Sequence, residues 1–206
     1  MFDIQNYYSF LLAILVFQLI PGAGTIAILN ATARNGVSAG LGAVMGTLLG
    51  DFVFMVAAAV GLAAVMRENP LLFEILQWFG AVYLCWLGLG LLRTKFDKQV
   101  DINEPKKSGW VYLKQGFAVS VTNPKVMLFF VAFFPLFLSP TSSSMTLFAM
   151  MLHVTILSFV YQALLVILGN SVAHKLKAIP FARKLATRLA GIALVAFGVK
   201  LALDNR

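Results

Sequence analysis

The stretch Gln18-Leu19-Ile20-Pro21-Gly22-Ala23-Gly24-Thr25 lies midway along an apolar segment that is long enough to cross a bilayer. Proline lacks the amide donor of a helical hydrogen bond and glycine adds backbone freedom, so Pro21-Gly22 predicts a break in the helix. Within lipid, every backbone group released by a break needs a partner, which implies protein or a wet cavity around it. A second break is predicted in the other half of the chain, at Thr122-Asn123-Pro124-Lys125.

The composition is that of an integral membrane protein. Of the 206 residues, 60% are hydrophobic and 12% are charged, whereas a soluble domain carries about 25% charged residues. The net charge of +8 raises the question of nucleic-acid binding. The basic residues gather in two loops, however, so membrane topology explains them better and no nucleic-acid partner is expected. The single cysteine, Cys85, excludes an intramolecular disulfide.

Six apolar segments of spanning length follow one another, and they predict an all-α membrane protein with six transmembrane helices. The expected spans are residues 8–30, 37–66, 71–92, 111–138, 144–171 and 182–203. A polar loop at 93–109 separates two halves of three spans each, about 1–95 and 110–206. The whole chain, 1–206, is therefore expected to form a single transmembrane domain.

Lysine and arginine set the predicted orientation. Twelve of them lie in or beside the loops that follow the first, third and fifth spans, whereas three lie on the opposite side. The positive-inside rule places the richer side in the cytoplasm. We therefore expect the 93–109 loop in the cytoplasm and both termini in the periplasm, with the chain in a bacterial inner membrane.

Paired features predict an inverted repeat. Pro21 and Pro124 each break the first span of a half, and a pair of glycines recurs in each last span: Gly80 and Gly88, then Gly191 and Gly198. Because each half has three spans, the halves enter the membrane in opposite directions. The result is a 3+3 inverted repeat with broken first and fourth helices, and paired breaks of this kind mark the binding site of a transporter. For the glycines alone, chance similarity between apolar helices is the alternative.

Two charged side chains are expected near the midplane of the membrane. Asp51 and Lys125 lie deep in their spans, at about the depth of Pro21. A charge at the centre of a membrane helix costs at least about 2.5 to 3.5 kcal/mol, so each needs a partner and could be the partner of the other. One interpretation is a substrate or proton site; the other is a structural ion pair that locks two helices together.

Other residues have weaker signals. Six polar side chains could line the same cavity, although each alone is more typical of an interhelical hydrogen bond: Gln18, Thr25, Asn30, His153, Tyr161 and Gln162. Four small residues on one face predict close helix packing: Gly42, Gly46, Gly50 and Gly61. An aromatic run is typical of core or lipid-facing residues, with one or two able to face an apolar substrate side chain: Phe129, Phe130, Phe133 and Phe134.

Enzyme and metal signatures are missing from the sequence. No zinc-protease, nucleophile-elbow or Walker motif occurs, and His153 has no histidine or cysteine at ligand spacing. We therefore expect no catalytic residue, no metal and no cofactor. Transport would have to be driven by an ion gradient, since the chain shows no ATPase motif.

These pieces together resemble the LysE/RhtB family of amino-acid exporters over essentially the whole chain. The matching parts are Pro21-Gly22, the glycine series that ends at Gly50-Asp51, Gly61-Leu62, and Asn123-Pro124-Lys125. The pattern Asn69-Pro70-Leu71-Leu72-Phe73 followed by Gly80-Ala81-x-Tyr83-Leu84 looks most like the leucine-exporter branch. The family usually has Pro-Gly-Pro at the first break. Here Ala23 replaces the second proline, which implies a milder break.

The predicted function is export of a neutral, leucine-like amino acid by proton antiport. The substrate carboxylate would meet Lys125 or the half-helix N-termini near Gly22 and Asn123. Its ammonium would meet Asp51 or unwound carbonyl groups. The expected partners are the amino acid, protons and lipid, while association into a homo-oligomer stays open. The alternatives are an exporter of another small solute or cation, and a membrane enzyme or scaffold subunit.

Overall fold

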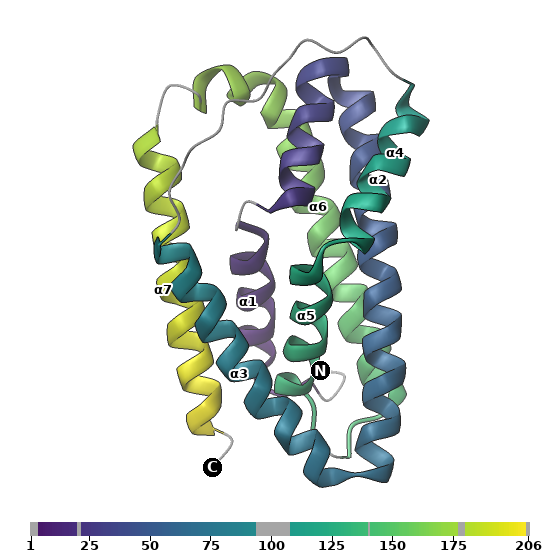
Figure 1. Cartoon of the computed structure of the whole chain (residues 1–206), viewed down its shortest axis with the longest axis vertical. Coiled ribbons are helices and arrows are strands. Elements are labelled where there is room, and N and C mark those ends of the chain that lie inside the picture. The colour runs from purple at the N-terminus through teal and green to yellow at the C-terminus, as the bar shows by residue number, and fades with distance from the viewer. Residues whose placement is uncertain (1–3, 20–21, 94–107, 140, 177–179, 205–206) are drawn as a thin grey trace.

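The structure, a computed structural model, describes residues 4–19, 22–93, 108–139, 141–176 and 180–204. All regular elements in these ranges are helical: α1 (Tyr7–Leu19), α2 (Ala23–Glu68), α3 (Pro70–Arg93), α4 (Gly109–Val121), α5 (Pro124–Phe133), the short 3-10 helix η1 (Phe134–Phe137), α6 (Ser144–Leu176) and α7 (Pro180–Asp204). Figure 1 shows them as an elongated bundle in which α1 begins and α7 ends toward the lower end. The predicted all-α class is confirmed for the described residues.

Helix α2 consists of two limbs that fold back on each other. Asn35 and Gly36 leave the helical region, and Gly36 adopts φ 77°, a conformation that favours glycine. The limbs, residues 23–34 and 37–68, are in contact: a Cβ added at Gly24 would lie 3.5 Å from the methyl group of Thr47. In Figure 1 the first limb continues the path of α1 beyond the first break, before the chain reverses at the upper end.

The second break separates α4 from α5, as the sequence predicted. The axes of Gly109–Val121 and Pro124–Phe137 are bent by 59° at this point. Pro124 can begin a helix because the first helical amide needs no partner within the helix. Asn123 caps α5, since its side-chain oxygen accepts a hydrogen bond from the Lys125 amide at 3.1 Å. Pro21, at the first predicted break, lies outside the described residues.

Several helices have the length and apolar character of membrane spans. Among the described residues, Ala23–Met66, Pro70–Gly90 and Ser144–Leu168 meet this criterion singly, and the bent pair of α4 with α5 and η1 meets it jointly. Helix α1 and Gly191–Lys200 of α7 are apolar but shorter. Large apolar side chains such as Leu71 and Trp86 are mostly exposed, as expected for surfaces that face lipid. The chain is therefore a membrane protein.

Glycines set the closest contact between α2 and α4. A Cβ at Gly46 would overlap the carbonyl oxygen of Leu113, and one at Gly42 would lie 2.6 Å from the carbonyl oxygen of Gly109. Gly50 similarly faces Ser120. Gly61 differs from the prediction, because it is exposed and a Cβ there would meet no described atom within 4 Å. The glycine face thus ends before Gly61, where α2 no longer faces α4.

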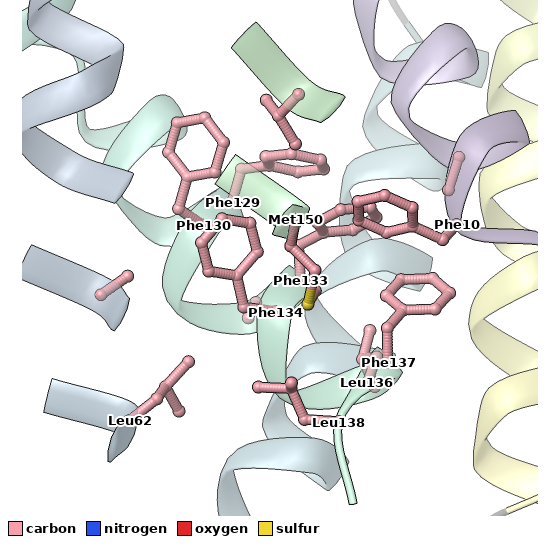
Figure 2. Close-up of a cluster of buried hydrophobic side chains, with 14 of the residues drawn as sticks. Phe10, Leu62, Phe129, Phe130, Phe133, Phe134, Leu136, Phe137, Leu138 and Met150 are labelled. Atoms are coloured by element: carbon pink, nitrogen blue, oxygen red, sulfur yellow. The ribbon is translucent and has the colours of Figure 1, made fainter. Parts of the chain in front are cut away.

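A cluster of aromatic rings fills the bundle between the second break and the end at which α1 begins and α7 ends. Figure 2 shows Phe10 of α1 packed with Phe133 of α5 and Phe137 of η1. The centroids of Phe10 and Phe133 are 5.6 Å apart, and those of Phe133 and Phe137 are 4.8 Å apart. All three rings are fully buried. The run predicted as core or lipid-facing is therefore core, and it closes this end of the bundle.

Candidate functional site

A cavity of about 60 Å³ lies beside the two breaks. It is lined by Phe17, Gln18, Gly22, Gly24, Thr25, Thr47, Asp51, Ser120, Asn123, Lys125, Val126 and Gln162. Since a single water needs roughly 10–15 Å³ by the same measure, the space holds a few waters. Its lining comes from α1, both limbs of α2, α4, α5 and α6, and thus from both halves of the chain.

The cavity gathers most of the residues that the sequence singled out: Gln18, Gly22, Thr25, Asp51, Asn123, Lys125 and Gln162. Two others stand apart from its lining. Pro124 is exposed at the first position of α5, and Tyr161 is half-buried on α6. Pro21 cannot be placed because it lies outside the described residues. That these side chains bind a substrate stays a prediction.

Five lining residues were missed by the sequence reasoning: Phe17, Gly24, Thr47, Ser120 and Val126. Helical spacing places Thr47 on the face of Asp51, because it precedes Asp51 by four residues, but the sequence assigned it no role in the site. Proximity to the second break could have found Ser120. Phe17 carried no such signal, since most of its neighbours on α1 are apolar and the helix has no distinct polar face.

Asp51 is held by α4. Its Oδ1 accepts a hydrogen bond from the Ser120 hydroxyl at 2.5 Å. The approach is possible because Gly50, the preceding residue, lets the backbone of α2 come close to Ser120. Among the described residues, Asp51 forms no ion pair with Lys125. The alternative of a helix-locking ion pair therefore has no support in this geometry.

Lys125 reaches from the second break to the first. Its ammonium lies 5.1 Å from the centroid of the Phe17 ring, and a Cβ added at Gly22 would be 3.9 Å from Nζ. Its own backbone is fixed, because its amide is capped by Asn123 and its carbonyl oxygen accepts from the Tyr83 hydroxyl at 3.1 Å. The base of the side chain is thus rigidly placed, while the positive charge lies in the cavity.

Hydrogen bonds between uncharged side chains join α6 to α1 and α2 beside the cavity. The oxygens of Thr47 and Gln162 lie 2.9 Å apart, and the amide of Gln18 donates to the Ser158 hydroxyl. Both contacts are interhelical, as the sequence suggested for such residues taken singly. They leave Asp51 and Lys125 as the charged side chains that face this cavity.

The two helix N-termini at the cavity differ in their free donors. At α5, the Lys125 amide already donates a hydrogen bond to the Asn123 side chain. The backbone carbonyl oxygen of Asn123 accepts hydrogen bonds from the amides of Val126 and Met127. The cap of α2 is Gly22, which has no side chain to offer. The first amides of α2, in residues 23–25, are therefore left without a capping side chain beside the ammonium of Lys125. Such a terminus favours an anion.

Comparisons with known proteins identify relatives across almost the whole chain. The family described as LysE type translocator matches residues 15–205. A leucine efflux protein of Klebsiella pneumoniae is 32% identical over 98% of this chain and 96% of the relative, and one of an Enterobacter strain is 31% identical over 98% and 97%. An uncharacterized membrane protein of Pseudomonas aeruginosa is 32% identical over 97% and 95%. No solved structure matches the chain.

The family match covers both breaks, Asp51 and Lys125, and it confirms the resemblance that the sequence motifs indicated. The matches also cover nearly the full length of these relatives. The alternatives of a membrane enzyme or a scaffold subunit are therefore set aside. The chain belongs to the LysE translocator family, and it is a membrane transporter rather than an enzyme.

Proposed function

We propose that this protein exports neutral amino acids across the bacterial inner membrane in exchange for protons. The observation that carries the proposal is the cavity beside the two breaks, which presents Asp51 and Lys125 as separate charges. An amino acid carries one charge of each sign on adjacent groups. A site with one fixed anion and one fixed cation, not neutralised by each other, is complementary to such a zwitterion.

The substrate carboxylate is assigned to Lys125 and the N-terminus of α2. The ammonium of Lys125 lies close to Gly22, and the amides of residues 23–25 have no capping side chain. A carboxylate there gains charge-assisted hydrogen bonds and the favourable end of the helix dipole. The substrate ammonium is assigned to Asp51, which now has a single hydroxyl partner, Ser120, among the described residues.

For alternating access, we infer six spans in two inverted halves. In this arrangement α1 with residues 23–34 is the first span, and α4 with α5 is the fourth. Hydrogen bonds support it: Gln18–Ser158 joins the first and fifth spans, and Ser120–Asp51 joins the equivalent fourth and second spans. The third and sixth spans, α3 and α7, meet at a mutual glycine contact of Gly88 with Gly191, as expected beside a pseudo-two-fold axis.

Proton coupling is assigned to Asp51. A carboxylate can carry a proton, and an exchanger needs a group that binds the proton and the substrate ammonium in turn. Asp51 is the acidic residue among those that line the cavity. Release of the proton from Asp51 on the cytoplasmic side would restore the carboxylate anion that binds the next substrate. This order links each substrate that leaves to a proton that enters.

Counterflow in proteoliposomes tests the function. Purified protein is reconstituted into vesicles loaded with one unlabelled amino acid, and uptake of labelled leucine, serine, lysine and glutamate is measured outside. We expect uptake of neutral amino acids, and weaker uptake of lysine and glutamate because the extra charge has no partner in the cavity. Exchange of inorganic cations without exchange of any amino acid would overturn the proposal.

The orientation provides a second test. We infer from the excess of lysine and arginine that the 93–109 loop lies in the cytoplasm. In a Cys85→Ala background, a membrane-impermeant maleimide should label Thr141→Cys in intact spheroplasts but label Lys98→Cys only in inside-out vesicles. Thr141 is exposed in the turn before α6 and serves as the matched site on the opposite side. Labelling of Lys98→Cys in intact spheroplasts would contradict the orientation.

A further inference from the structure

The apolar part of the cavity wall is formed by two side chains. Among the described lining residues, glycines aside, only Phe17 and Val126 are apolar. A neutral amino acid presents its two charges at one end and its side chain at the other. If the charged end meets Lys125 and Asp51, the side chain needs an apolar surface nearby, and Phe17 offers the larger one.

Phe17 is held in place from behind. Its ring is stacked on Phe129 with centroids 3.5 Å apart and an interplanar angle of 13°. Phe129 in turn stacks on Phe133 at 4.6 Å, and both are buried in the aromatic cluster of Figure 2. Close-packed rings of this kind cannot recede without opening voids. Phe17 is therefore a fixed floor, and it sets the depth of the apolar part of the cavity.

The front face of Phe17 is occupied by Lys125. Since Phe129 covers one face of the ring, the Lys125 ammonium, 5.1 Å from the centroid, lies over the other. An aromatic face is a favourable partner for an ammonium. A carboxylate binds an ammonium more strongly than an aromatic face does, because it adds charge-assisted hydrogen bonds. An arriving carboxylate therefore draws the ammonium away and uncovers the ring.

We propose that Phe17 determines substrate specificity by an exchange of partners. In the empty site, Lys125 covers the ring; in the filled site, the substrate carboxylate holds Lys125 and the apolar side chain of the substrate covers the ring. Binding then requires a carboxylate and an apolar side chain together, and the fixed floor selects aliphatic side chains over aromatic ones. The inference rests on the proposed function, since it assigns the side-chain end of the same site.

The test is competition with labelled leucine in counterflow, using reconstituted full-length protein. The competitors are phenylalanine, glycine, which lacks the side chain, and 3-methylbutylamine, which is leucine without its carboxylate. For the wild-type protein, unlabelled leucine should compete at least about tenfold better than each of these. A missing or poorly fitting side chain already separates substrates by that factor, and the amine lacks the carboxylate that binds Lys125. Equal competition by 3-methylbutylamine would overturn the exchange with Lys125.

Variants of Phe17 decide the role of the ring. Phe17→Ala removes the floor, so the apparent affinity for phenylalanine relative to leucine should rise by about tenfold or more, and Phe17→Leu should give a smaller rise in the same direction. Phe130→Leu is the matched control, because Phe130 also belongs to the aromatic cluster, is more deeply buried than Phe17 and does not line the cavity. It should leave the ratio unchanged.

The outcomes separate the inference from the function on which it rests. If the wild-type protein exchanges no amino acid, the proposed function fails. If it exchanges leucine but neither Phe17 variant changes the ratio of phenylalanine to leucine, only the role of Phe17 fails. Should Phe17→Ala not fold, Phe17→Leu, which keeps an apolar side chain against Phe129, decides the question. Exchange of serine without leucine would likewise overturn the inference and leave export of neutral amino acids standing.

Discussion

The Asp51→Asn variant should lose proton-driven efflux completely while it still folds and inserts. The amide keeps the size of the carboxyl group and can still accept the hydrogen bond from Ser120, so the contact between α2 and α4 is preserved. It cannot release or bind a proton in the working range. Efflux driven by a pH gradient should therefore fall to background. Counterflow of substrate should persist with a raised KM, because the amide oxygen can still accept a hydrogen bond from the substrate ammonium but no longer offers it a negative charge.

Two other variants show that the effect belongs to the carboxylate. Ser120→Ala removes only the hydrogen bond at 2.5 Å and should reduce efflux while leaving it sensitive to the pH gradient. Lys125→Met should instead weaken substrate binding, seen as a raised KM, while transport stays coupled to protons. All variants are measured for gradient-driven efflux, counterflow and thermal unfolding in detergent.

The double variant tests the remaining structural alternative. If Asp51 and Lys125 were a helix lock, each single change would destabilise the protein and the double change would restore it. Because the described residues show no ion pair between them, we expect no such rescue. An Asp51→Asn variant that transports normally, with its pH dependence intact, would show that the proton site lies elsewhere.

The order of helices was predictable because the sequence marks their ends by backbone chemistry. Pro70 and Pro124 each begin a helix, and Gly36 adopts the positive φ at which the chain reverses. These effects are local, so they need no knowledge of packing. The contact between the two limbs of α2 and the size of the bend between α4 and α5, 59°, depend on neighbouring helices, and hydrophobic pattern alone could not give them.

For the site, the nearness of the two charged residues was predictable, and the direction of the Lys125 side chain was not. The sequence placed Asp51 and Lys125 at one level, and both line the same cavity. It could not tell that Lys125 lies over Phe17 rather than beside Asp51, because a long side chain can reach in several directions from one backbone position. Phe17 was missed for a related reason, since on a helix without a distinct polar face little in the pattern separates the side that meets a cavity from the side that meets lipid.

The sharpest effect on stability is expected from Gly46→Ala. A Cβ at this position would overlap the carbonyl oxygen of Leu113 and lie 2.8 Å from the amide nitrogen of Phe117. Both are backbone atoms of α4, so no side chain can turn aside and the two helices must separate. Overpacking a well-packed contact costs about 1–3 kcal/mol, and a backbone neighbour favours the upper end. The measurement is the unfolding temperature in detergent, which should fall by several degrees.

Gly61→Ala is the control on the same helix, since Gly61 is exposed and its added Cβ would meet no described atom within 4 Å. It should unfold at the wild-type temperature or slightly above, because alanine favours helix over glycine. Equal losses in both variants would point to a general intolerance of α2, while no loss in either would show that α2 and α4 are not in such close contact. A loss at Gly46 alone ties the stability of the bundle to the glycine face that brings Asp51 against Ser120, because widening this contact also pulls the carboxylate away from its hydroxyl partner. Proton-driven efflux by Gly46→Ala, measured below its unfolding temperature, should therefore fall as well.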